Sequence, residues 1–168
     1  MSLLKLFLIS TTLVGTSVVA QTSLPQYGIK EDQPRTGSII KRNLVFGRRV
    51  PNNKRYDELT ADEKASVKGY YEQMEPGDEP PFPTDGLRSI DSALLKAQAK
   101  LLISGELTLV ASVDADGQVT EVKTIGSPSP EMTRFAASVL LLTKFKPALC
   151  LGQPCRMEFP FRYLFRVE

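Results

Sequence analysis

The sequence contains no histidine and no tryptophan, and only two of its 168 residues are cysteines. Without histidine there is no Ser-His or Cys-His catalytic pair and no metal site of the usual kind. No glycine-rich loop lies between a predicted strand and a helix, so phosphate-binding motifs are also missing. We therefore expect a protein that is not an enzyme, with no catalytic residues, no cofactor and no metal. An enzyme with an unfamiliar carboxylate site is the alternative.

A strong excess of one charge is missing too, because 21 Lys and Arg stand against 19 Asp and Glu, a formal net charge of +2. This balance does not call for a nucleic-acid partner. The densest basic cluster consists of Arg48, Arg49, Lys54 and Arg55, and an acidic stretch follows it. We interpret the cluster as a solvated face, with contact to a polyanion, either anionic lipid or cell-wall polymer, as the alternative.

The longest apolar run lies at the N-terminus. Lys5 precedes an uncharged stretch from Leu6 to Ala20, and small residues lead to a cleavage position before Gln21. This pattern is typical of a cleavable signal peptide over residues 1-20 and predicts an exported protein. The run is shorter than the ~20 apolar residues that a spanning helix needs. A retained inner-membrane anchor is the alternative, and we expect membrane contact only in that case.

The two cysteines, Cys150 and Cys155, are close neighbours in the chain. Gly152 and Pro154 between them allow a tight loop. In an oxidising compartment we expect the pair to form a disulfide bond. Two free core thiols and a redox pair are weaker alternatives, since redox pairs usually have Cys-x-x-Cys spacing. So short a loop is expected to fix local shape more than to add global stability.

Residues 21-79 are predicted to be an irregular N-terminal extension with one clear helix. A capping box from Thr60 to Glu63 begins this helix, and apolar spacing carries it to about residue 74. A short strand is predicted within Ser38 to Phe46. The sequence leaves open whether the extension folds with the residues that follow.

Residues 80-168 have the pattern of an α+β domain. A helix from Gly86 carries apolar residues three and four apart. A hairpin with a turn at Asp114 to Gly117 follows, and irregular spacing in its second strand indicates a bulge. A capped helix opens at Ser127, and a closing strand has aromatic residues at alternate positions. The predicted fold is a small antiparallel sheet with β-β-α-β order packed on helices. The predicted buried face of the helix after Ser127 is Met132, Phe135, Ala136, Val139 and Leu140.

Asp114 and Asp116 also belong to a segment, Ser112 to Lys123, that imitates a calcium-binding loop. Such a loop needs a bidentate glutamate at its twelfth position, which is Lys123 here. We therefore interpret both carboxylates as turn formers.

Taken in order, the motifs of residues 80-168 resemble the TonB C-terminal domain family. The matching features are the hairpin from Gly105 with its Asp-x-x-Gly turn and Val119, the capped helix to Leu142, Phe145-Lys146-Pro147-Ala148, Gly152-Gln153-Pro154, the final aromatic strand and the lead-in Pro81-Phe82-Pro83-x-x-Gly86. The resemblance implies a periplasmic domain of a Gram-negative bacterium that binds another envelope protein and is linked to envelope transport.

The resemblance also implies a way of binding, because TonB lends the edge of its last strand to a short partner segment. This suggests a partner-binding edge at Arg162, Leu164 and Arg166. Pro160 cannot donate a ladder hydrogen bond, so we expect it on an edge strand with its nitrogen outward. It blunts the N-terminal half of that edge against pairing.

Three features favour a soluble periplasmic module over a full energy transducer. The N-terminal run looks cleavable, the chain has no histidine, and residues 21 to 80 are too mixed for a long proline-rich spacer. The leading hypothesis is a TonB-like protein-binding module. The alternatives are an envelope-associated structural protein that binds cell-wall polymer or lipid, and a membrane-anchored energy transducer.

Overall fold

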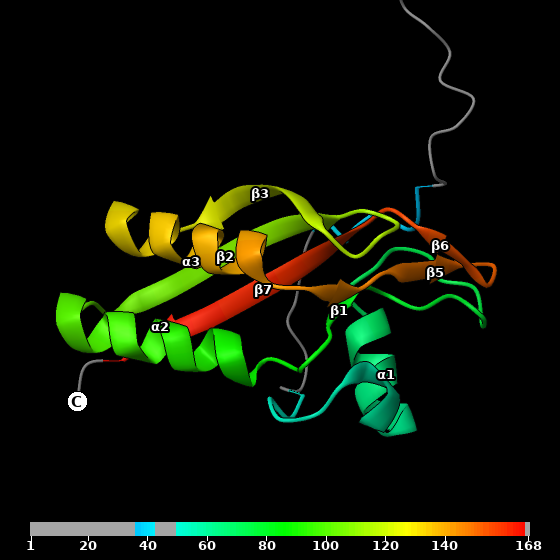
Figure 1. Cartoon of the computed structure of the whole chain (residues 1–168), viewed down its shortest axis with the longest axis horizontal. Coiled ribbons are helices and arrows are strands. Elements are labelled where there is room, and N and C mark those ends of the chain that lie inside the picture. The colour runs from blue at the N-terminus through cyan, green and yellow to red at the C-terminus, as the bar shows by residue number, and fades with distance from the viewer. Residues whose placement is uncertain (1–35, 43–49, 167–168) are drawn as a thin grey trace, which may run out of the picture. The chain divides into compact units, whose positions relative to one another are not determined.

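Residues 36–42 and 50–166 form an α+β fold of helices and small antiparallel sheets, and they are the part of the chain that the computed structural model describes (Figure 1). All of them belong to one compact unit, Asp32–Glu168. The predicted fold class is confirmed. The elements in chain order are a 3-10 turn (Tyr56–Glu58), α1 (Ala61–Lys68), β1 (Phe82–Pro83), α2 (Arg88–Leu101), β2 (Gly105–Val113), β3 (Val119–Gly126), α3 (Pro130–Leu142), β4 (Phe145–Lys146), β5 (Ala148–Cys150), β6 (Gln153–Cys155) and β7 (Met157–Phe165).

The central sheet has the antiparallel order β3-β2-β7. Apolar residues alternate along β2 and aromatic residues alternate along β7, so both strands bury the same face. The register between β2 and β3 shifts twice, and the bulge predicted from the irregular spacing of β3 is confirmed. The buried residues on this face are Leu107, Leu109, Ala111, Val113, Phe159, Phe161, Tyr163 and Phe165.

Helices α2 and α3 pack against each other and cover this buried face (Figure 1). Ser129 caps α3 by accepting a hydrogen bond from the amide of Met132 at 3.1 Å, and Pro130 is the first helical residue. Ala136 is buried, but Phe135 is 40% exposed, so the prediction that Phe135 is buried was wrong. Neighbouring residues lie about 100° apart around a helix, which takes Phe135 off the buried stripe.

Helix α1 begins at the predicted capping box but is shorter than predicted. The hydroxyl of Thr60 accepts from the amide of Glu63, whose carboxylate accepts from the amide of Thr60. The helix ends at Lys68 rather than near residue 74, with Gly69 as its C-cap. Tyr71 instead forms an antiparallel bridge with Ile40. Glycine is a poor helix former, and the backbone around Tyr71 pairs with a distant segment instead of continuing the helix that the local pattern predicted.

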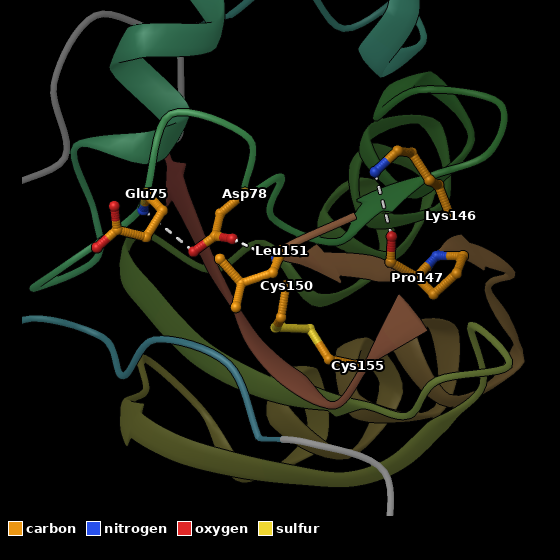
Figure 2. Close-up of a disulfide and its surroundings, with 7 residues drawn as sticks. All are labelled: Glu75, Asp78, Lys146, Pro147, Cys150, Leu151 and Cys155. Atoms are coloured by element: carbon orange, nitrogen blue, oxygen red, sulfur yellow. Dashed lines mark hydrogen bonds between the residues drawn. A yellow bond between two sulfur atoms is a disulfide. The ribbon is translucent and has the colours of Figure 1, made fainter. Parts of the chain in front are cut away.

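Strands β5 and β6 form a β-hairpin with a two-residue loop. The predicted disulfide between Cys150 and Cys155 links its two strands and is confirmed (Figure 2). Leu151 and Gly152 at its tip both have positive φ, at 52° and 79°, as such tight turns require. Asp78 holds the tip because its Oδ1 accepts from the amide of Leu151 at 2.8 Å. Its other oxygen accepts from the amide of Glu75 at 3.1 Å.

Part of the N-terminal extension shares the core of the sheet. Val50, Tyr56, Leu59 and Val67 belong to one buried cluster with the inward residues of β2, β7, α2 and α3. A second, smaller cluster joins Tyr71, Ala148, Cys150, Cys155 and Met157. The segment predicted as a strand, Ser38 to Phe46, is described only up to residue 42, where Ile40 forms its bridge with Tyr71.

Candidate functional site

Strand β7 lies at an edge of the central sheet, where β2 is its strand partner within the described residues. The prediction that Pro160 lies on an edge strand is therefore confirmed. Pro160 is opposite Val110. Opposite residues in an antiparallel ladder alternate between pairs that exchange hydrogen bonds and pairs that do not. Because proline has no amide hydrogen, we assign Pro160 and Val110 to the pairs without hydrogen bonds. The peptide groups of Glu158, Arg162 and Leu164 then point away from β2, as that of Pro160 does.

The N-terminal half of this outer edge is closed by other parts of the chain. The amide of Gly37 donates to the carbonyl of Arg156 at 2.7 Å, next to the parallel bridge between Thr36 and Arg156. The hydroxyl of Tyr71 donates to the carbonyl of Glu158 at 2.7 Å. Burial raises the pKa of the Tyr71 hydroxyl well above its usual range, so this donor keeps its proton. Pro160 then has no amide to offer.

The C-terminal half of the edge borders a groove with a volume of about 610 Å³. Most of its lining residues are apolar, and they come from the extension, α1, β1, the start of α2 and β7. Asn52 and Asp91 connect two of these parts, because the side-chain amide of Asn52 donates to Asp91 at 3.0 Å. The lining residues are Val50, Pro51, Asn52, Val67, Tyr70, Phe82, Leu87, Asp91, Phe159, Pro160, Phe161, Arg162 and Leu164.

The predicted edge residues have different positions relative to this groove. Arg162 and Leu164 both line it, and Leu164 is partly exposed. Arg166 lies just beyond the end of β7 and is not among the lining residues. Its carbonyl accepts a hydrogen bond from the side chain of Gln98 at 2.6 Å. The structure therefore brings two of the three predicted residues together at the groove.

An ion pair fixes the side chain of Arg162 across the sheet. Its Nη2 lies 2.6 Å from Oε2 of Glu106, the neighbour of Leu164 in the β2 register. This hydrogen bond from Arg162 lowers the pKa of the Glu106 carboxyl, and Thr108 donates a further bond to the same carboxylate at 3.2 Å. The ion pair holds the side chain of Arg162 in place beside the groove without adding net charge.

Sequence reasoning missed Tyr71, Gln98, Asn52 and Asp91, which close or shape this edge. Tyr71 was placed on a helix by its local spacing, and the other three are polar residues without a distinctive motif. Asn52 and Asp91 are 39 residues apart, and Gln98 reaches the backbone of a residue 68 positions away. A local pattern holds no signal for partners at such separations.

The predicted polyanion cluster is only partly described. Lys54 lies 2.9 Å from a carboxylate oxygen of Glu63. Arg55 lies 3.4 Å from Asp57 and 3.5 Å from Glu58. Arg48 and Arg49 lie outside the described residues. The described cations already have carboxylate partners, which favours the interpretation as a solvated face.

Two further findings concern the described residues alone. Residues 36–42 and 50–166 contain no group of three or more Cys, Asp or Glu side chains placed to hold a metal ion. No helix within these ranges combines the length and apolar character needed to cross a membrane. At the calcium-like segment, Oδ1 of Asp114 accepts from the amides of Asp116 and Gln118, so its interpretation as a turn former is confirmed.

Comparison with known proteins gives a distant structural likeness. No protein-family model matches the chain, and no curated protein matches it. Among solved structures, the chain is similar to the NMR solution structure of the C-terminal domain of TonB from Helicobacter pylori. The sequence identity is 19%, the match covers 66% of this chain and 99% of that domain, and the TM-score is 0.31. A likeness of this extent assigns neither family nor function, so function has to be argued from the groove itself.

Proposed function

We propose that this chain is an exported TonB-like module that binds an extended segment of another envelope protein along the outer edge of β7. The observation that carries the proposal is the position of Leu164, which lines a groove of about 610 Å³ and whose peptide group points away from β2 in the assigned register. An added strand would form hydrogen bonds with that peptide group and place alternate side chains in the groove. The module acts by binding rather than by catalysis.

The length of the edge limits the partner segment. Gly37 and Tyr71 occupy carbonyls before Pro160, and Gln98 occupies the carbonyl of Arg166. Backbone pairing is thereby confined to a few residues around Leu164. The groove walls would have to supply much of the affinity through apolar contact, since so few hydrogen bonds are offered.

Export and a periplasmic location belong to the same proposal. The N-terminal pattern supports a cleavable signal, and the buried disulfide suits an oxidising compartment. Mass spectrometry of the chain recovered from cells should find Gln21 as its first residue. An intact N-terminus in the inner membrane would favour the membrane-anchored transducer instead.

The strand-edge mode is tested by proline at Leu164. This amide points away from β2, so Leu164→Pro should keep the β2 ladder while removing the donor that a partner needs. We expect Leu164→Pro to lose partner capture from envelope extracts, while Leu164→Ala retains most of it. Hydrogen exchange at Leu164 in the wild-type chain should slow when the captured partner is added.

The matched control is Glu158→Pro, a proline in the closed half of the same strand and with the same orientation. We expect this variant to capture the partner as the wild type does. Circular dichroism and urea unfolding must show that each variant is folded. Equal capture by a folded Leu164→Pro variant would rule out pairing at this edge.

A further inference from the structure

The outer surface of the two packed helices is unusually apolar for a solvent-facing layer. Six of the large exposed apolar side chains lie on α2, on α3 or directly after α2, whereas the other four are scattered singly. Isolated exposed apolar residues are normal, but a gathering of them marks an interaction site. The six are Leu95, Leu101, Leu102, Phe135, Leu141 and Leu142.

Several of them share the solvent side of their helices. Phe135 and Leu142 are seven residues apart on α3 and so lie along one line of that helix, while Leu95 lies on α2 and Leu102 is its exposed C-cap. The line on α3 is off the buried stripe, since Leu142 is 86% exposed while Leu140 is buried. Because α2 and α3 lie side by side (Figure 1), their outer sides form one layer, which we call the helical face.

The charges of the helical face are mainly positive. Four cations on or just after these helices form no ion pair with any described residue: Arg88, Lys96, Lys100 and Lys144. The two carboxylates within the helices are already engaged. Asp91 accepts from Asn52, and Glu131 lies 3.8 Å from Arg134. A ligand of this face therefore meets apolar side chains beside unneutralised positive charge.

We propose that the helical face docks on the surface of a lipid bilayer that contains anionic lipids. Apolar side chains flanked by basic residues suit the boundary between acyl chains and anionic headgroups. A second copy of the chain fits poorly, because a two-fold contact through this face would bring like charges together. A bilayer also needs no preformed pocket. The groove at β7 is separate from the helical face, because its lining includes only Leu87 and Asp91 from the start of α2. This surface goes beyond the proposed function, since it leaves the β7 edge to a protein partner, and it replaces the expectation that only a retained N-terminal anchor would contact a membrane.

The absence of tryptophan gives a direct test with the full chain. Leu142→Trp places a single tryptophan on the helical face, and Leu151→Trp places one at the tip of the β5–β6 hairpin, where Leu151 is 66% exposed. With vesicles of equal parts phosphatidylglycerol and phosphatidylcholine, we expect the emission of Leu142→Trp to shift to the blue and to be quenched by brominated acyl chains. The emission of Leu151→Trp should not change.

A charge-matched pair of variants tests the electrostatic part in the Leu142→Trp background. Lys96→Ala/Lys100→Ala removes two positive charges from the helical face, and Lys41→Ala/Arg42→Ala removes two from the segment beside Tyr71. Since a basic residue near an anionic surface contributes about fivefold in affinity, we expect about 25-fold weaker vesicle binding for the first variant. The second variant should bind nearly as the unmodified background does.

Several outcomes would overturn the proposal. One is an unshifted Leu142→Trp spectrum with anionic vesicles, and another is an equal shift at both tryptophans. Equal weakening by the two charge variants would mean that net charge, rather than this face, drives binding. A blue shift that grows with protein concentration in the absence of vesicles would assign the face to a second copy of the chain.

Discussion

The two halves of the outer edge of β7 differ in what is left for a partner. Before Pro160 the backbone carbonyls of Arg156 and Glu158 already accept bonds from Gly37 and Tyr71. After Pro160 the edge borders a groove at Leu164. A long unprotected edge strand invites indiscriminate pairing between chains. Closing one half of the edge and leaving only a short segment of the other half open reconciles the proposed binding edge with protection against such pairing.

The two halves also differ in how they are packed. Met157 in the closed half belongs to the small cluster that contains the disulfide, whereas Phe161, Tyr163 and Phe165 in the open half belong to the large cluster under α2 and α3, which Phe159 joins next to Pro160. The closed half therefore depends on a covalent bond and a few long-range hydrogen bonds. The open half depends on the burial of large apolar side chains. Each dependence can be broken separately.

The largest effect is expected from Phe82→Ala. Phe82 is 1% exposed, its ring centroid lies 5.9 Å from that of Tyr56 and 6.3 Å from that of Phe159, and it lines the groove. Removing this ring should lower the free energy of unfolding by about 3 to 5 kcal/mol, measured by urea denaturation. Leu142→Ala, at an exposed position, should change it by less than about 0.5 kcal/mol. Similar small losses in both variants would contradict a core shared by the extension and the sheet.

A smaller effect is expected from removing the disulfide in the closed half. Cys150→Ala/Cys155→Ala opens a short loop, so we expect a loss of about 2 kcal/mol in the free energy of unfolding. Hydrogen exchange should speed up at the amides of Leu149 and Leu151, which bond to Glu79 and Asp78. The amides of β2 should exchange as before. Faster exchange throughout the sheet would mean that the disulfide supports the whole fold rather than one half of the edge.

The hydroxyl of Tyr71 is expected to matter less, and its removal tests the closure itself. Tyr71→Phe leaves the carbonyl of Glu158 without its 2.7 Å donor and should cost about 1 kcal/mol in the free energy of unfolding. The ring stays, so the small cluster keeps its packing. Sedimentation should show more self-association than in the wild type, because more of the edge is open. An unchanged association state would indicate that Pro160 alone is enough to protect this half.

The sequence predicted features that are set within a few residues. The bulged hairpin, the serine cap of α3, the alternating aromatic face of β7 and the disulfide all follow from local spacing, and all are confirmed. The edge position of Pro160 was also predictable locally, because a residue without an amide hydrogen is confined to an edge strand of a sheet. These features also suffice for the fold class.

What the sequence could not predict depends on partners far along the chain. Helix α1 ends at Lys68 because Gly69 caps it and Tyr71 pairs with Ile40, whereas the local apolar spacing continues to Met74. The groove needs Asn52, Asp91 and Leu164 to meet, and nothing in their neighbourhoods indicates it. The sequence was therefore enough to propose edge residues, but not to predict which of their backbone groups already form hydrogen bonds within the chain.

The smallest effect concerns the ion pair beside the open half. Arg162 and Glu106 lie 2.6 Å apart, but both side chains are about 40% exposed, so the pair should contribute less than about 1 kcal/mol. The hydrogen bond from Arg162 lowers the pKa of Glu106 in the folded chain. A lowered folded pKa means that this stabilisation is present above the unfolded pKa, about 4.3, and is lost as pH falls through the folded pKa.

Glu106→Gln tests this sign directly, because glutamine keeps the shape of the side chain but cannot carry the charge. Urea unfolding should find the variant slightly less stable than the wild type at about pH 7, and the difference should shrink as pH falls through the lowered folded pKa of Glu106 and its carboxylate takes up a proton. Salt should reduce the difference at neutral pH, as for any exposed pair. A difference that persists in acid would have to come from shape or from the bond to Thr108. Glu106 would then support the edge through its shape and hydrogen bonds rather than through its charge.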